Sequence, residues 1–372
     1  MPSFGMAATY RGRAWTARDT ACNGEIMLKN WLEGGTGFAF LNPLAWLTGG
    51  ASRAVTPALA PVPVPMSVPD QPGQGTVTAG EFPAGGPGMR YKLYIPRSHA
   101  GRGSPLIVML HGCRQSADDF ACGTQMNVLA DQSGCLILYP EQSPAANGIG
   151  CWNWFEAANQ QRDRGEPASI AGLTRAVIDQ YGVDPTRVFI AGLSSGASMA
   201  VILGQTYPDL FAAVGSHSGL AYASANSVFA GLMAMRNGAN RLRMVATARA
   251  RRVPTIVFHG DRDATVHPNN GAIIVAQLLR AAPRLDGERV WGRRSSTTHK
   301  GRTTGRGYTR KVHVDGAGEL IAEHWVVHGS GHAWSGGSAD GSYTDVAGPN
   351  AGLEMLRFFL SLKPRRAATG PS

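Results

Sequence analysis

A serine flanked by glycines carries the clearest chemical signal in the sequence. Gly192, Ser194 and Gly196 form the pattern G-x-S-x-G within RVFIAGLSSGASMAVILG, between an apolar run of strand length and an apolar run of helical length. In that setting the chain turns so sharply that larger side chains at the glycine positions would collide with the strand and the helix. We therefore expect Ser194 to stand above a sheet edge as a nucleophile, and Ser195 to begin the helix.

Two aspartates and two histidines further along the chain are candidates to activate this serine. A serine hydroxyl needs a histidine to take its proton, and that histidine needs a carboxylate to fix its tautomer. Asp263 is preferred over Asp261 because it lies further into the loop of TIVFHGDRDATVHP. His332 is preferred over His328 because glycines flank it past the last strand, in VVHGSGHAWSGG. Other histidines are expected to be structural or to lie at the rim of the site: His111, His217, His259 and His267.

Two backbone amides are suited to hold the oxyanion that such a reaction creates. Acyl transfer needs hydrogen-bond donors placed in advance around the developing negative charge. The amide of Ser195 lies at a helix start, where the helix dipole favours negative charge, and that of Cys113 lies in LHGCRQ after an early strand. If Cys113 is instead a merely buried thiol, its backbone amide can still serve. Chemistry of this kind needs neither a metal nor a cofactor.

The elements that must position these residues are visible from Met89 onward as strand-length apolar runs alternating with segments of helical periodicity. The expected strands are RYKLYIP, PLIVMLHG, CLILYP, RVFIAG, AVGSHSG, VPTIVFHG and AEHWVVHG. Helical spacing recurs over residues 170–181 and 353–360, and Asp315-Gly316 predicts a hairpin turn. This alternation predicts an α/β-hydrolase fold, with a mostly parallel central sheet and helices on both faces.

Four regions are expected along the chain. Residues 1–48 form an N-terminal extension with an apolar segment from Trp31 to Leu47, which is suited to docking or adsorption. Residues 49–88 are dominated by Pro, Gly, Ala and Val and are expected to be a linker without helix or sheet. Residues 89–363 form the catalytic domain, and residues 364–372 a basic disordered tail.

The net charge of +10 raises the question of an anionic partner such as nucleic acid. Much of it falls in one stretch interleaved with Gly, Ser and Thr: Arg289, Arg293, Arg294, Lys300, Arg302, Arg306, Arg310 and Lys311. No zinc-finger spacing or RNA-binding aromatic motif accompanies these side chains. We therefore expect a solvated basic loop and no nucleic-acid partner.

Cysteine usage and hydropathy limit the remaining classes. The five cysteines contain no CxxC pair, so a zinc site is not expected, and the odd number leaves at least one thiol unpaired. The first residues hold no continuous apolar run of the length of a signal peptide, and no stretch approaches the roughly 20 apolar residues of a membrane helix. By these criteria the expected location is the cytoplasm, with no transmembrane segment. The oligomeric state is not predicted.

Five motifs occur together in an order that resembles a known family. LHGCRQSADDFACGTQMNVLAD, CWNWF, GLSSGASMA, HGDRDATV and GSGHAWSGG resemble the esterases of the polyhydroxybutyrate (PHB) depolymerase family, over residues 89–363. The resemblance implies an α/β-hydrolase domain that cleaves carboxylic esters without metal or cofactor, with Ser194, Asp263 and His332 as triad and Cys113 as an oxyanion amide. Family members are often exported, so it also points to an extracellular location.

The resemblance leaves the substrate open. Hydroxyacyl esters or oligomers of a poly(3-hydroxyalkanoate), including an insoluble polyester, are the first expectation, with Trp152, Trp154 and Trp334 lining an acyl cleft; core packing is an equal alternative for Trp152 and Trp154. Feruloyl and acetylxylan esterases are similar in these motifs, so carbohydrate esters are the alternative. A non-catalytic protein that coats polymer granules or binds nucleic acid is the remote one. The resemblance also brings Cys113 and Cys151 together, which predicts a disulfide beside the pocket.

Overall fold

One ten-stranded sheet organises the part of the chain that the structure, a computed structural model, describes: residues 75–83, 88–239, 253–280, 294–303 and 305–363. Its strands, in spatial order, are β1 (Thr76–Phe82), β2 (Met89–Ile95), β4 (Leu136–Pro140), β3 (Leu106–Leu110), β5 (Val188–Leu193), β6 (Ala213–His217), β7 (Thr255–Gly260), β10 (Leu320–Val327), β9 (Gly307–Val314) and β8 (Ser295–Arg302). The six strands from β4 to β10 in this order are parallel. Antiparallel strands extend the sheet at both edges.

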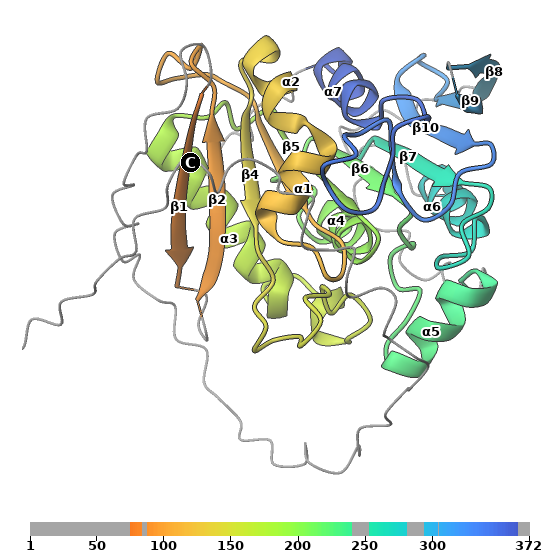
Figure 1. Cartoon of the computed structure of the whole chain (residues 1–372), viewed down its shortest axis with the longest axis horizontal. Coiled ribbons are helices and arrows are strands. Elements are labelled where there is room, and N and C mark those ends of the chain that lie inside the picture. Colours follow the sequence, from red (N-terminus) through yellow and green to blue (C-terminus); the bar gives the residue numbers. More distant parts are fainter. Residues whose placement is uncertain (1–74, 84–87, 240–252, 281–293, 304, 364–372) are drawn as a thin grey trace, which may run out of the picture.

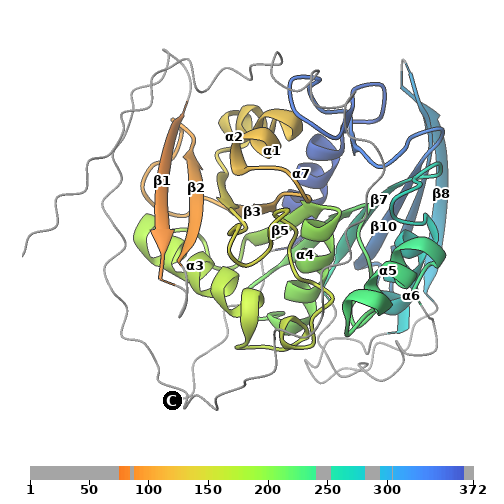
Figure 2. The same cartoon turned by 60° about the horizontal axis from the view of Figure 1, so that its bottom comes forward.

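Helices cover both faces of this sheet (Figure 2). On one face lie α3 (Gly165–Tyr181), α4 (Ser195–Thr206), α5 (Val228–Asn237) and α6 (Asn269–Arg280), and on the other α1 (Ala117–Thr124), α2 (Met126–Ser133) and α7 (Ala351–Ser361). Strand β3 shows why two helical layers form, because its side chains alternate between the two cores. Leu106 and Val108 pack in one core, and Ile107 packs in the other. The α/β-hydrolase architecture expected from the sequence is confirmed.

Each strand expected from the sequence is present, and the Asp315-Gly316 turn joins β9 to β10 as an antiparallel hairpin. The backbone amide of Asp315 donates to the carbonyl of Glu319, which closes this turn at 2.9 Å. The chain crosses from β5 into α4 and from β7 and β10 into loops at the same end of the parallel strands (Figure 1). Side chains at these three strand ends can therefore converge.

Strand β1 lies inside the range expected to be a linker without sheet structure. Its sequence TVTAGEF holds β-branched and aromatic residues, and it pairs with β2 along its whole length, from Thr76 opposite Ile95 to Phe82 opposite Met89. The ring of Phe82 also packs against the core on the α3 side. The proline-rich composition of the preceding residues concealed this short strand. The described sheet thus begins at Thr76, before the expected boundary at residue 89. The rest of the expected extension, linker and tail lies outside the described residues.

The basic stretch is also more ordered than expected. Instead of a solvated loop, residues 295–302 and 307–314 form the β8–β9 hairpin. Arg310 makes a paired contact with the buried carboxylate of Glu323, at 2.7 and 2.9 Å. Much of β8 is exposed at the edge of the sheet. Charged residues on an exposed edge strand discourage pairing with other chains, so this stretch has a structural explanation.

Candidate active site

The turn from β5 into α4 has the geometry of a strained nucleophile elbow. Ser194 adopts a φ of 58° and a ψ of −117°, which non-glycine residues rarely populate. A side chain at Gly192 or Gly196 would collide with the carbonyl oxygen of Leu110 at the end of β3. Ser194 is partly exposed between buried neighbours, whereas Ser195 is buried at the start of α4. Of the two adjacent serines, Ser194 is therefore the accessible one.

Asp263 and His332 meet at the ends of the neighbouring strands β7 and β10. Asp263 Oδ2 lies 2.7 Å from His332 Nδ1, and the carboxylate side chain is fully buried. Its Oδ1 accepts hydrogen bonds from the backbone amides of Thr265 and Val266, at 2.9 and 2.8 Å. A carboxylate bonded to Nδ1 fixes the tautomer in which Nε2 can accept a proton. His332 is largely buried and keeps some contact with solvent.

The charge of Asp263 is sustained by its hydrogen bonds. Burial by itself would raise the pKa of Asp263, but the hydrogen bonds of His259 and His332 and the Val266 amide bring this pKa well below its ordinary value. His259 Nε2 donates to the carbonyl oxygen of Val266 at 2.8 Å and lies 3.4 Å from Asp263 Oδ2. The acid loop is thus held from within the sheet, and its carboxylate stays ionised.

The loop that carries His332 crosses the end of β7 at close range. A Cβ atom at Gly260 would lie 2.6 Å from the carbonyl oxygen of Gly331, so this crossing requires glycine. The hydroxyl of Ser330 donates to Asp345 Oδ2 at 2.6 Å, and Arg306 Nε donates to the same oxygen at 3.0 Å. These contacts fix the loop on both sides of the imidazole.

Among the described residues, Ser194 and His332 are not joined by a hydrogen bond. The structure therefore assembles the acid and the base, and places the nucleophile on the elbow at the end of β5. In enzymes without bound substrate, catalytic hydrogen bonds are often long and tighten in the reacting complex. The amide of Ser194 donates to the carbonyl of His217, at 2.9 Å, which ties the elbow to β6.

The two expected oxyanion donors lie on adjoining segments. The hydroxyl of Ser195 lies 3.4 Å from Cys113 Sγ, so the start of α4 contacts the loop after β3. Within the described residues, the backbone amides of Cys113 and Ser195 have no acceptor. The Gly112 amide, by contrast, donates to the side chain of Gln115 at 2.9 Å. Two free amides beside a nucleophile are what an oxyanion hole requires.

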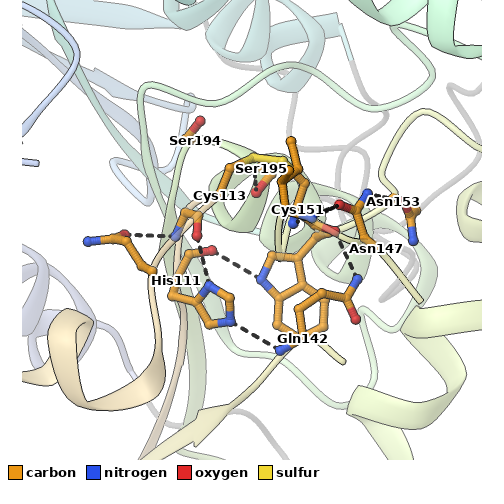
Figure 3. The surroundings of a disulfide bond; sticks show 12 residues. His111, Cys113, Gln142, Asn147, Cys151, Asn153, Ser194 and Ser195 are labelled. Atoms are coloured by element: carbon orange, nitrogen blue, oxygen red, sulfur yellow. Dashed lines mark hydrogen bonds between the residues drawn. A yellow bond between two sulfur atoms is a disulfide. The ribbon is translucent and has the colours of Figure 1, made fainter. Parts of the chain in front are cut away.

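A disulfide links the loop after β3 to the loop after β4 (Figure 3). It joins Cys113 and Cys151, the pair that the resemblance suggested, and Cys135 is a buried free thiol. His111 lies beside this bridge and connects the same loops: its Nδ1 donates to the Gly112 carbonyl at 2.8 Å, and its Nε2 accepts from the Gln142 amide at 3.1 Å. Burial lowers the pKa of His111, which suits this neutral, bridging role.

The three tryptophans expected to line an acyl cleft are buried instead. The exposed fractions of Trp152, Trp154 and Trp334 are 0%, 4% and 1%. Trp152 Nε1 donates to the carbonyl of His111 at 3.1 Å, and Trp334 packs edge-on against Phe120. Such large apolar rings contribute most when they are removed from water, and here they support the loops of the site from behind. The expectation of a cleft lined by these rings is corrected to core packing.

Sequence reasoning missed the polar residues that hold the site loops. Gln142 and Glu166 follow no motif, and their importance comes from contacts across the fold. His259 was expected to be structural, and it stands one residue before the glycine that the histidine loop crosses. No group of three or more metal-ligating side chains occurs within the described ranges. Nor does any helix there have the length and apolar character needed to span a bilayer.

With this geometry in place, comparison with known proteins identifies the class. Residues 89–301 match the family described as esterase PHB depolymerase, and the chain belongs to that family. It is 29% identical over 238 residues to poly(3-hydroxyalkanoate) depolymerase C of Paucimonas lemoignei, covering 62% of this chain and 55% of that protein. It is 31% identical over 197 residues to a probable acetylxylan esterase A of Neosartorya fischeri, covering 48% and 51%. The chain thus spans about half the length of these relatives.

A solved structure supports the fold assignment independently. The acetyl xylan esterase from Aspergillus awamori superposes with a TM-score of 0.54 at 22% identity, covering 69% of this chain and 94% of that one. Similarity at this level of identity shows a shared fold. It agrees with the sheet order and the helical layers described above.

Proposed function

We propose that the protein is a serine esterase that hydrolyses carboxylic esters through an acyl-enzyme, with Ser194 as nucleophile, Asp263 as acid and His332 as base. The contact of 2.7 Å between Asp263 Oδ2 and His332 Nδ1, made at the strand ends beside a serine elbow, carries this proposal. Membership of the esterase PHB depolymerase family supports it. The separate positions of the three residues in the chain make a coincidental arrangement improbable.

The proposed reaction has two halves. In the first, Ser194 Oγ attacks the ester carbonyl carbon while His332 Nε2 takes its proton, and the carbonyl oxygen becomes an oxyanion held by the amides of Cys113 and Ser195. The carbon–oxygen bond to the alcohol then breaks, and His332 returns the proton to that alcohol. In the second half, water attacks the acyl-enzyme in the same way and releases the acid.

For the substrate we propose hydroxyacyl esters of the poly(3-hydroxyalkanoate) type, as polymer or oligomer. The depolymerase of Paucimonas lemoignei, matched over a longer stretch than the other relative, supports this class. Esters of acetylated sugars are the second candidate, because a probable acetylxylan esterase matches at a similar identity. The buried tryptophans give no reason to prefer either acyl group.

One side-by-side experiment tests activity and substrate class. The purified chain is incubated with p-nitrophenyl butyrate, 3-hydroxybutyrate oligomers, acetylated xylan and a feruloyl ester, alongside Ser194→Ala as control. Hydrolysis of p-nitrophenyl butyrate by the first protein alone supports a serine esterase. The substrate with the highest kcat/KM then decides between the two candidates, and absence of hydrolysis of all four contradicts the proposed function.

We also propose that the protein works in an oxidising compartment. The bridge between Cys113 and Cys151 supports this, because structural disulfides persist outside the reducing cytosol. The expectation of a cytoplasmic location rested on the opening residues alone. Mass-spectrometric mapping of protein isolated from its native source, alkylated before lysis, tests the proposal. Free thiols at both positions would contradict it.

A further inference from the structure

Glu166 places a carboxylate in the middle of the loop that follows β4. It lies in the first turn of α3, and its Oε1 accepts hydrogen bonds from Gln142 Nε2 at 2.6 Å and from Asn153 Nδ2 at 2.7 Å. Its Oε2 accepts from the backbone amide of Asn153 at 2.8 Å. Burial raises the pKa of Glu166 to about 7 against the effect of these donors. All three partners belong to residues 142–153, so one side chain gathers both ends of this segment.

Gln142 and Asn153 pass this anchoring on to the interior of the segment. Gln142 Nε2 also donates to the carbonyl of Cys151 at 2.9 Å. Asn153 Oδ1 accepts from Asn147 Nδ2 at 2.8 Å, and Asn147 Oδ1 accepts from the Cys151 amide at 3.3 Å (Figure 3). Both backbone groups of Cys151 are therefore held by side chains that Glu166 reaches directly or through one residue.

The same segment is attached to the loop after β3 at four points. Two are backbone contacts of Gln142 and Ile149: the Gln142 amide donates to His111 Nε2 at 3.1 Å, and the Arg114 amide donates to the Ile149 carbonyl at 2.8 Å. The other two are the disulfide of Cys113 with Cys151 and the hydrogen bond from the Trp152 indole to the His111 carbonyl. Residues on both sides of Cys113, and Cys113 itself, thus take their positions from residues 142–153.

We propose that Glu166 is a positioning residue for the oxyanion amide of Cys113, acting through residues 142–153; this rests on the proposed function. The carboxylate touches neither the substrate nor the reacting atoms. It fixes the segment from which the oxyanion loop is suspended. A displaced donor stabilises the transition state less while substrate binding is retained, so the effect falls on kcat and leaves KM nearly constant.

The test compares Glu166→Gln with Glu156→Gln as matched control. Glu156 is an exposed carboxylate between the same loop and α3, and it lies outside the chain of contacts to Cys113. In Glu166→Gln the new amide group faces the donors of Gln142 and Asn153, so at least one contact is lost. Rates are measured with p-nitrophenyl butyrate and divided by the concentration of sites that a fluorophosphonate labels, which removes the effect of unfolded protein.

We expect Glu166→Gln to lower kcat per labelled site by about 10–100-fold, less than the roughly 10²–10³-fold cost of deleting an oxyanion donor. KM should change less than about twofold, and the Ki of phenylboronic acid, whose serine adduct uses the same donors, should rise in proportion to the fall in kcat. Glu156→Gln should match the unmodified protein in all three quantities. An unchanged kcat per labelled site, or an unchanged boronate Ki, in Glu166→Gln would overturn the proposal.

A second variant keeps the test available if Glu166→Gln does not fold. Gln142→Met preserves the length of the side chain and removes its bonds to Glu166 and to the Cys151 carbonyl, while its backbone amide still reaches His111. A fall of about threefold or more in kcat per labelled site, at constant KM, supports the positioning role, and a smaller fall counts against it. Loss of activity in the unmodified protein would instead contradict the proposed function, so the two failures are distinguishable.

Discussion

Asp261 and His328 form a second aspartate–histidine pair beside that of Asp263 and His332. Asp261 Oδ2 lies 2.9 Å from His328 Nδ1, and Asp261 Oδ1 accepts the Gly329 amide at 2.7 Å. Both members of this pair are substantially exposed, whereas the Asp263 side chain is fully buried. The sequence offered both aspartates and both histidines as candidates because each pair occupies the same two strand ends.

The two aspartates should therefore differ sharply in their effect on activity. Asp263→Asn leaves His332 in the wrong tautomer and is expected to lower kcat by roughly 10³–10⁴-fold. Asp261→Asn weakens an exposed pair, of a kind worth about 0–1 kcal/mol, and should cost less than about tenfold. Steady-state kinetics on a soluble ester checks both values. A larger loss for Asp261→Asn than for Asp263→Asn would show that the second pair is the catalytic one.

Opening the disulfide should reduce both stability and turnover. The bridge closes a loop with a sequence separation of 38, for which chain entropy alone predicts a contribution on the order of 3–4 kcal/mol. Cys151→Ser removes it and frees the oxyanion loop at one of its four attachments. We expect a lower urea midpoint and a lower kcat, measured against Cys135→Ser, which changes a free thiol. Cys151→Ser with full activity and an unchanged midpoint would contradict a bracing role.

Truncation distinguishes strand β1 from the residues before it. Deleting residues 1–74 leaves all the described contacts in place, and turnover of a soluble ester should be nearly unchanged. Deleting residues 1–88 also removes β1 and the Phe82 ring from the core, and bares the edge of β2. We expect that deletion to lower Tm by on the order of 10 °C. Equal Tm values for the two truncated chains would show that β1 is dispensable.

These comparisons indicate what the sequence could and could not predict. The parallel strands and the elbow at Ser194 have local signatures, namely apolar runs and a glycine pattern. The β8 strand and the burial of Trp334 depend on distant partners, so composition suggested a loop in one case and a cleft in the other. The role of Glu166 depends on side chains from three segments, and no spacing in the sequence indicates that they meet.

Stability should fall as the solution is acidified below pH 6.5. Burial, together with the nearby charges of His259 and His332, lowers the pKa of His217 to about 3, below the ordinary value of 6.5. The unfolded chain therefore binds a proton that the folded chain refuses, so stability present above pH 6.5 is lost as pH falls towards 3, by about 1.4 kcal/mol per pKa unit at most.

His217→Gln tests this linkage, because glutamine can still accept the Ser335 amide that His217 Nε2 accepts at 3.0 Å, yet does not titrate. Urea unfolding between pH 4 and pH 7 should give a flatter pH dependence for this variant than for the unmodified chain. Identical slopes would show that His217 does not contribute to acid sensitivity.

Covalent labelling tests the central claim most directly. A fluorophosphonate reacts only with a serine that is activated by its base and faced by an oxyanion hole. After treatment of the folded protein, peptide mapping should locate the phosphonyl group on Ser194, with ester hydrolysis lost in proportion to labelling. Ser194→Ala should be folded, unlabelled and inactive. A label on Ser195, or ester hydrolysis that persists in Ser194→Ala, would contradict the assignment of the nucleophile.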